Sequence, residues 1–114
     1  MNMLVKETCV PCEGNTKPLT HEEIEELMPD VTGWRLEDKK IRREFIYKNF
    51  VQAVDFINRI ADVAEYEDHH PDLHLVGYRN VAVEIWTHAV GGLTENDFIL
   101  AAKIDQLPVA LKIA

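Results

Sequence analysis

Hydrophobic and polar positions follow two periodic patterns along this chain, one typical of helices and the other of strands. Apolar residues recur at helical spacing near residues 20–28, 50–68 and 94–107. They alternate with polar residues near residues 34–47 and 73–87. The predicted order of elements is therefore α-ββ-α-ββ-α. Hairpins joined by helices favour an α+β domain, with a four-stranded antiparallel sheet and helices packed on one face.

Capping signals mark where these helices begin. Thr20 with Glu23 three residues later is typical of a capping box, and Thr94 with Asp97 repeats the pattern before the last helix. Asn49 is a favourable N-cap for the second helix. We therefore expect each helix to begin directly after its cap.

The second helix carries the clearest apolar stripe. Pro71 limits its length, because a proline disfavours the α conformation of the preceding residue, His70. Helical spacing predicts a buried face formed by Val51, Val54, Ile57, Ile60 or Ala61, and Ala64.

Carboxylates crowd the last turns of this second helix, where the helix dipole disfavours negative charge. They are Asp62, Glu65, Glu67 and Asp68. Residues that break a local rule tend to occur at functional sites. We therefore expect a site near this helix end.

With 114 residues, the chain is long enough for one domain and too short for two. We divide it into an irregular N-terminal arm (1–18), a single domain (19–108) and a short C-terminal tail (109–114). A formal charge of −8 argues against nucleic-acid binding, and no apolar stretch reaches the roughly 18 residues of a membrane span. The first residues lack the apolar core of a signal peptide, so we expect a cytoplasmic location.

Both cysteines lie in one motif, Cys9-Val10-Pro11-Cys12. A zinc ribbon would need a second pair of ligands, and the chain has no other cysteine. A thioredoxin-like pair should open a helix, whereas the residues up to Pro18 are typical of a loop. The remaining interpretation is two reduced thiols in a loosely held arm.

Four of the five histidines lie between residues 69 and 88. Imidazole has an ordinary pKa of about 6.5, which allows proton transfer near neutrality. His69 and His70 precede one predicted strand, and His88 follows the next. If these strands form a hairpin, its open end brings the three histidines together. The sequence therefore predicts a site for acid–base chemistry.

Several of these residues also have a purely structural interpretation. Asp97 is explained by its capping box, Trp86 is expected to pack, and His74 is expected at the surface. His70 and His74 have a spacing that binds zinc on a helix, but the intervening proline precludes a regular helix. No metal site is expected.

In combination, these residues resemble the signature of the pterin-4a-carbinolamine dehydratases. The resemblance covers roughly residues 18–107. It rests on Glu65-x-x-x-His69-His70-Pro71, on Tyr78, on Thr87-His88, and on Gly91-Gly92-Leu93-Thr94 with Asp97.

The resemblance implies a four-stranded antiparallel sheet with helices on one face, assembled as homodimers or homotetramers. It implies the loss of water from 4a-hydroxytetrahydropterin, giving quinonoid dihydropterin in tetrahydrobiopterin recycling after an aromatic amino acid hydroxylase, with no cofactor. The implied catalytic residues are His69, His70 and His88, supported by Glu65 and Asp97. The alternative is a non-catalytic binding role on the same fold, as an assembly or dimerisation cofactor, which would not need the histidines.

Overall fold

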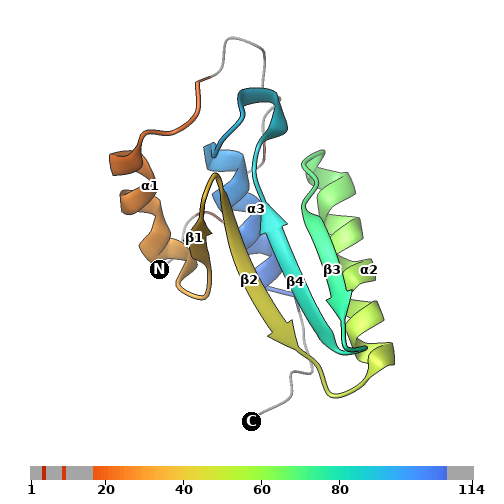
Figure 1. Cartoon of the computed structure of the whole chain (residues 1–114). Coiled ribbons are helices and arrows are strands. Elements are labelled where there is room, and N and C mark those ends of the chain that lie inside the picture. The colour runs from red at the N-terminus through yellow and green to blue at the C-terminus, as the bar shows by residue number, and fades with distance from the viewer. Residues whose placement is uncertain (1–3, 5–8, 10–16, 108–114) are drawn as a thin grey trace.

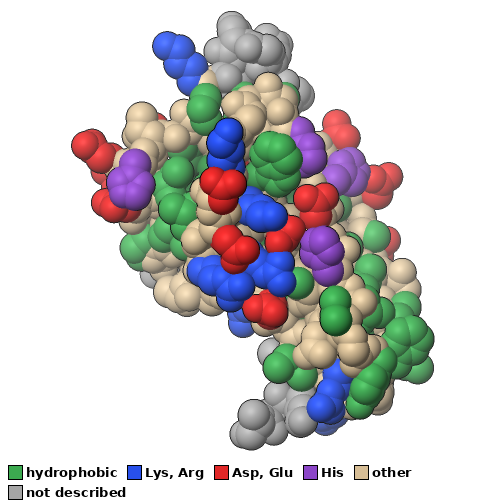
Figure 2. All heavy atoms as spheres, in the orientation of Figure 1, with side chains coloured by type: hydrophobic (Ala, Val, Ile, Leu, Met, Phe, Trp, Pro, Cys, Tyr) green, Lys and Arg blue, Asp and Glu red, His purple; other side chains and the backbone are tan. Residues whose placement is uncertain are grey.

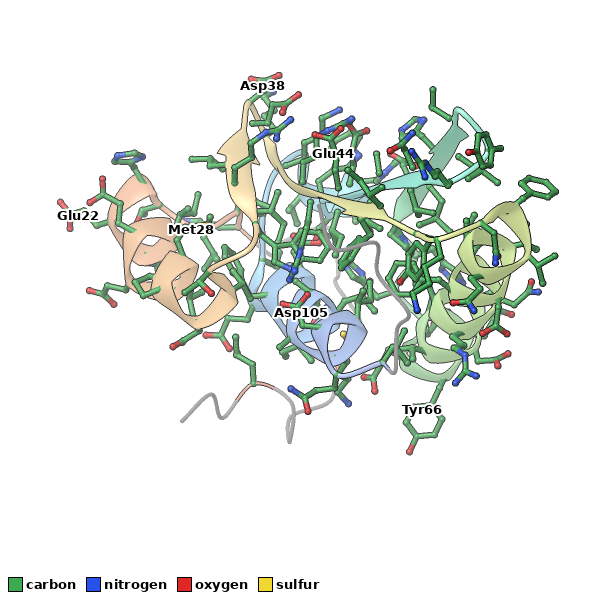
Figure 3. The ribbon with its side chains drawn as sticks, turned by 90° about the horizontal axis from the view of Figure 1, so that it is seen from below. Glu22, Met28, Asp38, Glu44, Tyr66 and Asp105 are labelled. Atoms are coloured by element: carbon green, nitrogen blue, oxygen red, sulfur yellow. The ribbon has the colours of Figure 1, made fainter. Side chains whose placement is uncertain are left out.

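The computed structural model describes Leu4, Cys9 and residues 17–107. Its elements are α1 (His21–Leu27), η2 (Met28–Val31), β1 (Arg35–Glu37), β2 (Lys40–Ile46), α2 (Phe50–Glu67), β3 (Asp72–Val76), β4 (Asn80–Ile85), η3 (His88–Val90) and α3 (Glu95–Asp105), where η marks a 3-10 helix. The strands form one antiparallel sheet in the order β1-β2-β4-β3. Figures 1 and 3 show the α-helices on one side of this sheet. The predicted α+β class and element order are confirmed.

The helices begin where the capping signals predict. Thr20 and Glu23 exchange the two hydrogen bonds of a capping box. Asn49 accepts a hydrogen bond from a backbone N–H of the first turn of α2, at 2.9 Å. At the start of α3, the Asp97 carboxylate accepts the Thr94 N–H at 2.8 Å. Each cap satisfies N–H groups that the helix itself leaves unpaired.

The buried face of α2 matches the prediction in its second half, at Ile60 and Ala64, and differs from it in its first half. Val51 is 75% exposed and Ala61 also lies in solvent. Phe56 sets the rotation of the helix about its axis, because its ring packs against that of Phe45 in the core. The two ring centroids are 4.7 Å apart. The residues of α2 that are buried are Ala53, Phe56, Ile60, Ala64 and Glu67.

The face of the sheet opposite the helices carries a network of charges. Glu84 is almost buried at its centre and accepts hydrogen bonds from Lys40 at 3.1 Å and from Arg42. His74 Nε2 also lies 3.1 Å from Glu84. Burial raises the pKa of Glu84, but these hydrogen bonds outweigh burial and lower it to about 2. Figure 2 shows these charges over the middle of the sheet.

Apolar side chains gather on the same face towards the lower end in Figure 2. Exposed large apolar residues of the elements that meet there are Ile46, Phe50, Val76 and Tyr78. No helix in the described part of the chain combines the length and the hydropathy that crossing a membrane requires.

Candidate active site

Four element ends meet at one end of the molecule. There α2 ends, β3 begins, β4 ends and α3 begins (Figure 1). The hairpin register explains this, because Asp72 pairs with Glu84 and leaves the chain before β3 beside the chain after β4. A cavity of about 480 Å³ opens at this end. Its lining includes His69, His70 and His88, together with Asp68, Asp72, Trp86 and Asn96.

His69 is placed by the way α2 ends. Asp68 adopts a left-handed conformation, with φ 53° and ψ 41°, which ends the helix before Pro71. The His69 N–H then donates to the Ala64 carbonyl at 3.1 Å. The His69 ring lies close to α3, where its Nε2 is 2.6 Å from Asp97 Oδ1. The His69 side chain is only 12% exposed.

Asp97 accepts hydrogen bonds on both carboxylate oxygens, and it is fully buried. Its Oδ2 accepts from the Thr94 N–H at 2.8 Å and from the Thr87 hydroxyl at 2.9 Å. The Thr87 hydroxyl has already donated its proton to Asp97. In the 2.9 Å contact between the Thr87 and Thr94 hydroxyls, Thr94 is therefore the donor and Thr87 the acceptor. The capping interpretation of Asp97 is thus confirmed, and its other oxygen remains for His69.

His70 lies on the solvent side of the cavity. Its Nε2 contacts Glu65 Oε2, and the two side chains are 54% and 76% exposed. An exposed ion pair of this kind contributes little free energy. The buried contact to a histidine therefore comes from Asp97, while the contact from Glu65 is open to water.

Trp86 stacks on His88 at the cavity wall. The two ring centroids are 3.9 Å apart, with 31° between the ring planes. The expectation that Trp86 packs is confirmed, because it packs against the core, but its place in the cavity wall was not expected. Sequence reasoning also missed Asn96, which lines the cavity from the first turn of α3. His74 belongs to the Glu84 network instead.

This arrangement can bind a flat ring and move protons around it. The cavity has the size of a small-molecule site. A stacked tryptophan and histidine offer an aromatic surface, and imidazoles can give and take protons. Among the described residues, no group of three or more His, Cys, Asp or Glu side chains could hold a metal ion.

Comparison with known proteins agrees with this picture. The family described as Pterin 4 alpha carbinolamine dehydratase matches residues 17–107. The chain is 52% identical to the Arabidopsis thaliana protein named pterin-4-alpha-carbinolamine dehydratase 2, mitochondrial, over 89% of this chain and 57% of that protein. A protein of Nitrosospira multiformis named for the same dehydratase is 52% identical, over 91% of each chain.

A solved structure supports the same assignment. It is described as a transcriptional coactivator/pterin dehydratase from Brucella melitensis. It superimposes with a TM-score of 0.73 at 35% identity, over 78% of this chain and 96% of that one. This chain therefore belongs to the pterin 4 alpha carbinolamine dehydratase family.

Proposed function

We propose that this protein removes water from 4a-hydroxytetrahydropterin to give quinonoid dihydropterin, by histidine acid–base catalysis. The observation that carries the proposal is the cavity where His69, His70 and His88 meet, with one of them bound to a buried carboxylate. Family membership supports the same reaction. We also propose that no metal or organic cofactor takes part.

The reaction needs protons at two places on the substrate. The bond from C4a to the hydroxyl oxygen breaks, and an acid has to protonate that oxygen so that water leaves. A base removes the proton from N5, and the electron pair that is released forms the double bond between C4a and N5. A positioned acid or base typically accelerates such a step by about 10²–10⁴-fold.

We assign His69 and His88 to the hydroxyl side of the substrate, and His70 to contact with the pterin or to the N5 proton. The contact with Asp97 supports this for His69, because a carboxylate that accepts from Nε2–H leaves Nδ1 to exchange protons. The stacking of Trp86 on His88 supports a pterin plane beside that ring. The exposed Glu65 orients His70.

The natural partners follow from the same chemistry. The substrate is a small pterin, and an aromatic amino acid hydroxylase would supply it. We propose a homodimer or homotetramer, because β3 is an edge strand of the described sheet. A cytoplasmic location stays a prediction, since the Arabidopsis relative is named as mitochondrial.

The test is the rate of quinonoid dihydropterin formation from 4a-hydroxytetrahydropterin. The protein should accelerate it, and His69→Ala and His88→Ala should each lower kcat by at least about tenfold. His74→Ala is the matched control, because this histidine belongs to the Glu84 network. Full activity in both single variants would contradict the catalytic assignment.

A second candidate is a binding role, as an assembly or dimerisation cofactor. The description of the Brucella structure as a coactivator as well as a dehydratase favours it. Such a role does not need the histidines. A chain that binds a protein partner and leaves the pterin reaction at its uncatalysed rate would support this candidate instead.

A further inference from the structure

Glu67, the last residue of α2, is a charged side chain buried beside the candidate site. Its side chain is 2% exposed. Charged residues are rarely buried so deeply unless they are paired. Glu67 Oε2 accepts a hydrogen bond from Lys103 Nζ of α3 at 2.6 Å. Glu67 Oε1 accepts the backbone N–H of Cys9 at 2.8 Å.

Cys9 also touches the wall of the cavity. Its thiol donates to the carbonyl of Asn96 at 3.6 Å, and Asn96 lines the cavity. Burial, followed by the nearby charge of Glu67, raises the pKa of Cys9 to about 12, so the thiol stays protonated. Sequence reasoning placed Cys9 in a loosely held arm; in the structure it is half-buried and hydrogen-bonded. Cys12 lies outside the described residues.

Among the described residues, two polar contacts join the end of α2 to α3. One is the contact between His69 and Asp97, and the other is the pair formed by Glu67 and Lys103. Glu67 precedes His69 by only two residues. A shift of the α2 end would consequently move His69 relative to a carboxylate that is fixed at the start of α3.

We propose that Glu67 is a positioning residue for the site. By binding Lys103 and the Cys9 N–H, it fixes the end of α2 against α3. This holds His69 Nε2 within reach of Asp97. The inference rests on the proposed function for its kinetic consequence, because a misplacement of about 1 Å can cost a catalyst about 10²-fold.

Lys103→Met removes the cation that pairs with Glu67 and keeps most of the length of the side chain. It should lower kcat by about tenfold and leave KM within about twofold, because His69 is displaced while the rest of the cavity is kept. Lys103→Arg restores a cation and should restore kcat. Arg43→Met is the matched control, since Arg43 pairs with Asp105 of the same helix at 2.9 Å and does not line the cavity.

The control separates positioning from stability. Arg43→Met should lower the melting temperature and keep kcat. If Lys103→Met does not fold, the double variant Glu67→Gln with Lys103→Met avoids an unpaired buried charge and should show the same loss of kcat. A wild-type kcat in the folded variant, or equal losses in the Lys103 and Arg43 variants, would overturn the proposal.

Two substitutions at Cys9 separate its backbone from its thiol. Cys9→Pro removes the N–H that Glu67 binds, and it should reproduce the loss of kcat. Cys9→Ala keeps this N–H and removes only a weak S–H donor, so its kcat should lie clearly above that of Cys9→Pro. Equal kcat values in the two variants would show that the Cys9 N–H does not position the site.

A readout without substrate keeps this proposal separate from the proposed function. The ring-nitrogen NMR signals of His69 report its contact with Asp97 whether or not the protein is a dehydratase. Lys103→Met should shift these signals and Arg43→Met should not. An inactive wild type with these shifts would refute the dehydratase and keep the positioning role. Unshifted His69 signals in Lys103→Met would refute the positioning role.

Discussion

Asp97→Asn isolates what the buried carboxylate does for His69. An asparagine of the same shape offers one acceptor oxygen and one donor nitrogen. Its oxygen has to face Thr94 and Thr87, because both donate hydrogen bonds there. Its NH₂ group then faces His69 Nε2 in place of the acceptor that is 2.6 Å away in the native protein. His69 must accept at Nε2 and carry its proton on Nδ1.

In this tautomer Nε2 carries no proton, so donation of the Nδ1 proton to the leaving hydroxyl would leave an unfavourable imidazolate anion. Because a positioned acid or base contributes about 10²–10⁴-fold, kcat should fall by about 100-fold or more. This corresponds to roughly 2.7 kcal/mol, at about 1.36 kcal/mol for each tenfold change. The free energy of unfolding should change less. The cap of α3, worth about 1 kcal/mol, is kept, and a charge-assisted hydrogen bond of about 1.5–3 kcal/mol is replaced by a neutral one.

The assay is quinonoid dihydropterin formation at saturating substrate, with urea unfolding measured in parallel. Asp105→Asn is the matched control. Asp105 lies at the opposite end of α3 (Figure 3) and accepts from Trp34 Nε1 at 3.0 Å and from Arg43 at 2.9 Å. The control should lose stability and keep kcat. If Asp97→Asn retains the wild-type kcat while His69→Ala loses activity, the tautomer argument is refuted.

The remaining predictions concern acid stability, metal and assembly. Because the pKa of Glu84 is lowered from 4.5 to about 2, its contribution to stability is present above about pH 4.5 and lost as the pH falls towards 2. The difference in unfolding free energy between wild type and Glu84→Gln should shrink over this interval, by at most about 3 kcal/mol. Protein treated with a chelator should keep its activity and melting temperature; stoichiometric zinc whose removal abolishes activity would contradict this. Light scattering should give a mass two or four times the monomer mass of 13.1 kDa. A mass equal to that of the monomer would show that the β3 edge is protected in another way.

The meeting of the histidines could be predicted because antiparallel pairing fixes which chain ends are neighbours. Once β3 and β4 form a hairpin, the residues just before β3 lie beside those just after β4. Alternation and capping residues are local signals, and they place both strands and all three helix starts. Thus His69, His70 and His88 reach one cavity for reasons that the sequence alone contains.

The rotation of α2 could not be predicted in the same way. This helix has apolar residues on more than one face, so a stripe through Val51 and Val54 fits helical spacing as well as the real one through Ala53 and Phe56. The choice between them depends on the contact of Phe56 with the core rings. That contact is tertiary, and no local pattern encodes it.

The carboxylates crowded at the end of α2 predict a nearby site, and the structure shows what three of them do. Glu65 stays in water beside His70, and Asp68 supplies the left-handed end of the helix. Glu67 is buried and paired with Lys103, a residue 36 positions away. A sequence pattern marks such charges as unfavourable, but it does not show which distant cation compensates them.

Asp97 shows why a structural and a catalytic interpretation of one residue need not compete. Its Oδ2 accepts hydrogen bonds at the start of α3. If the carboxylate rotated away, the buried donors of Thr94 and Thr87 would be left unpaired. Oδ1 is consequently held in one place, 2.6 Å from His69 Nε2. The helix cap thus supplies the rigidity that the proposed control of the His69 tautomer requires. A carboxylate on a mobile loop could form the same hydrogen bond, but it would pay the conformational entropy of ordering in each encounter.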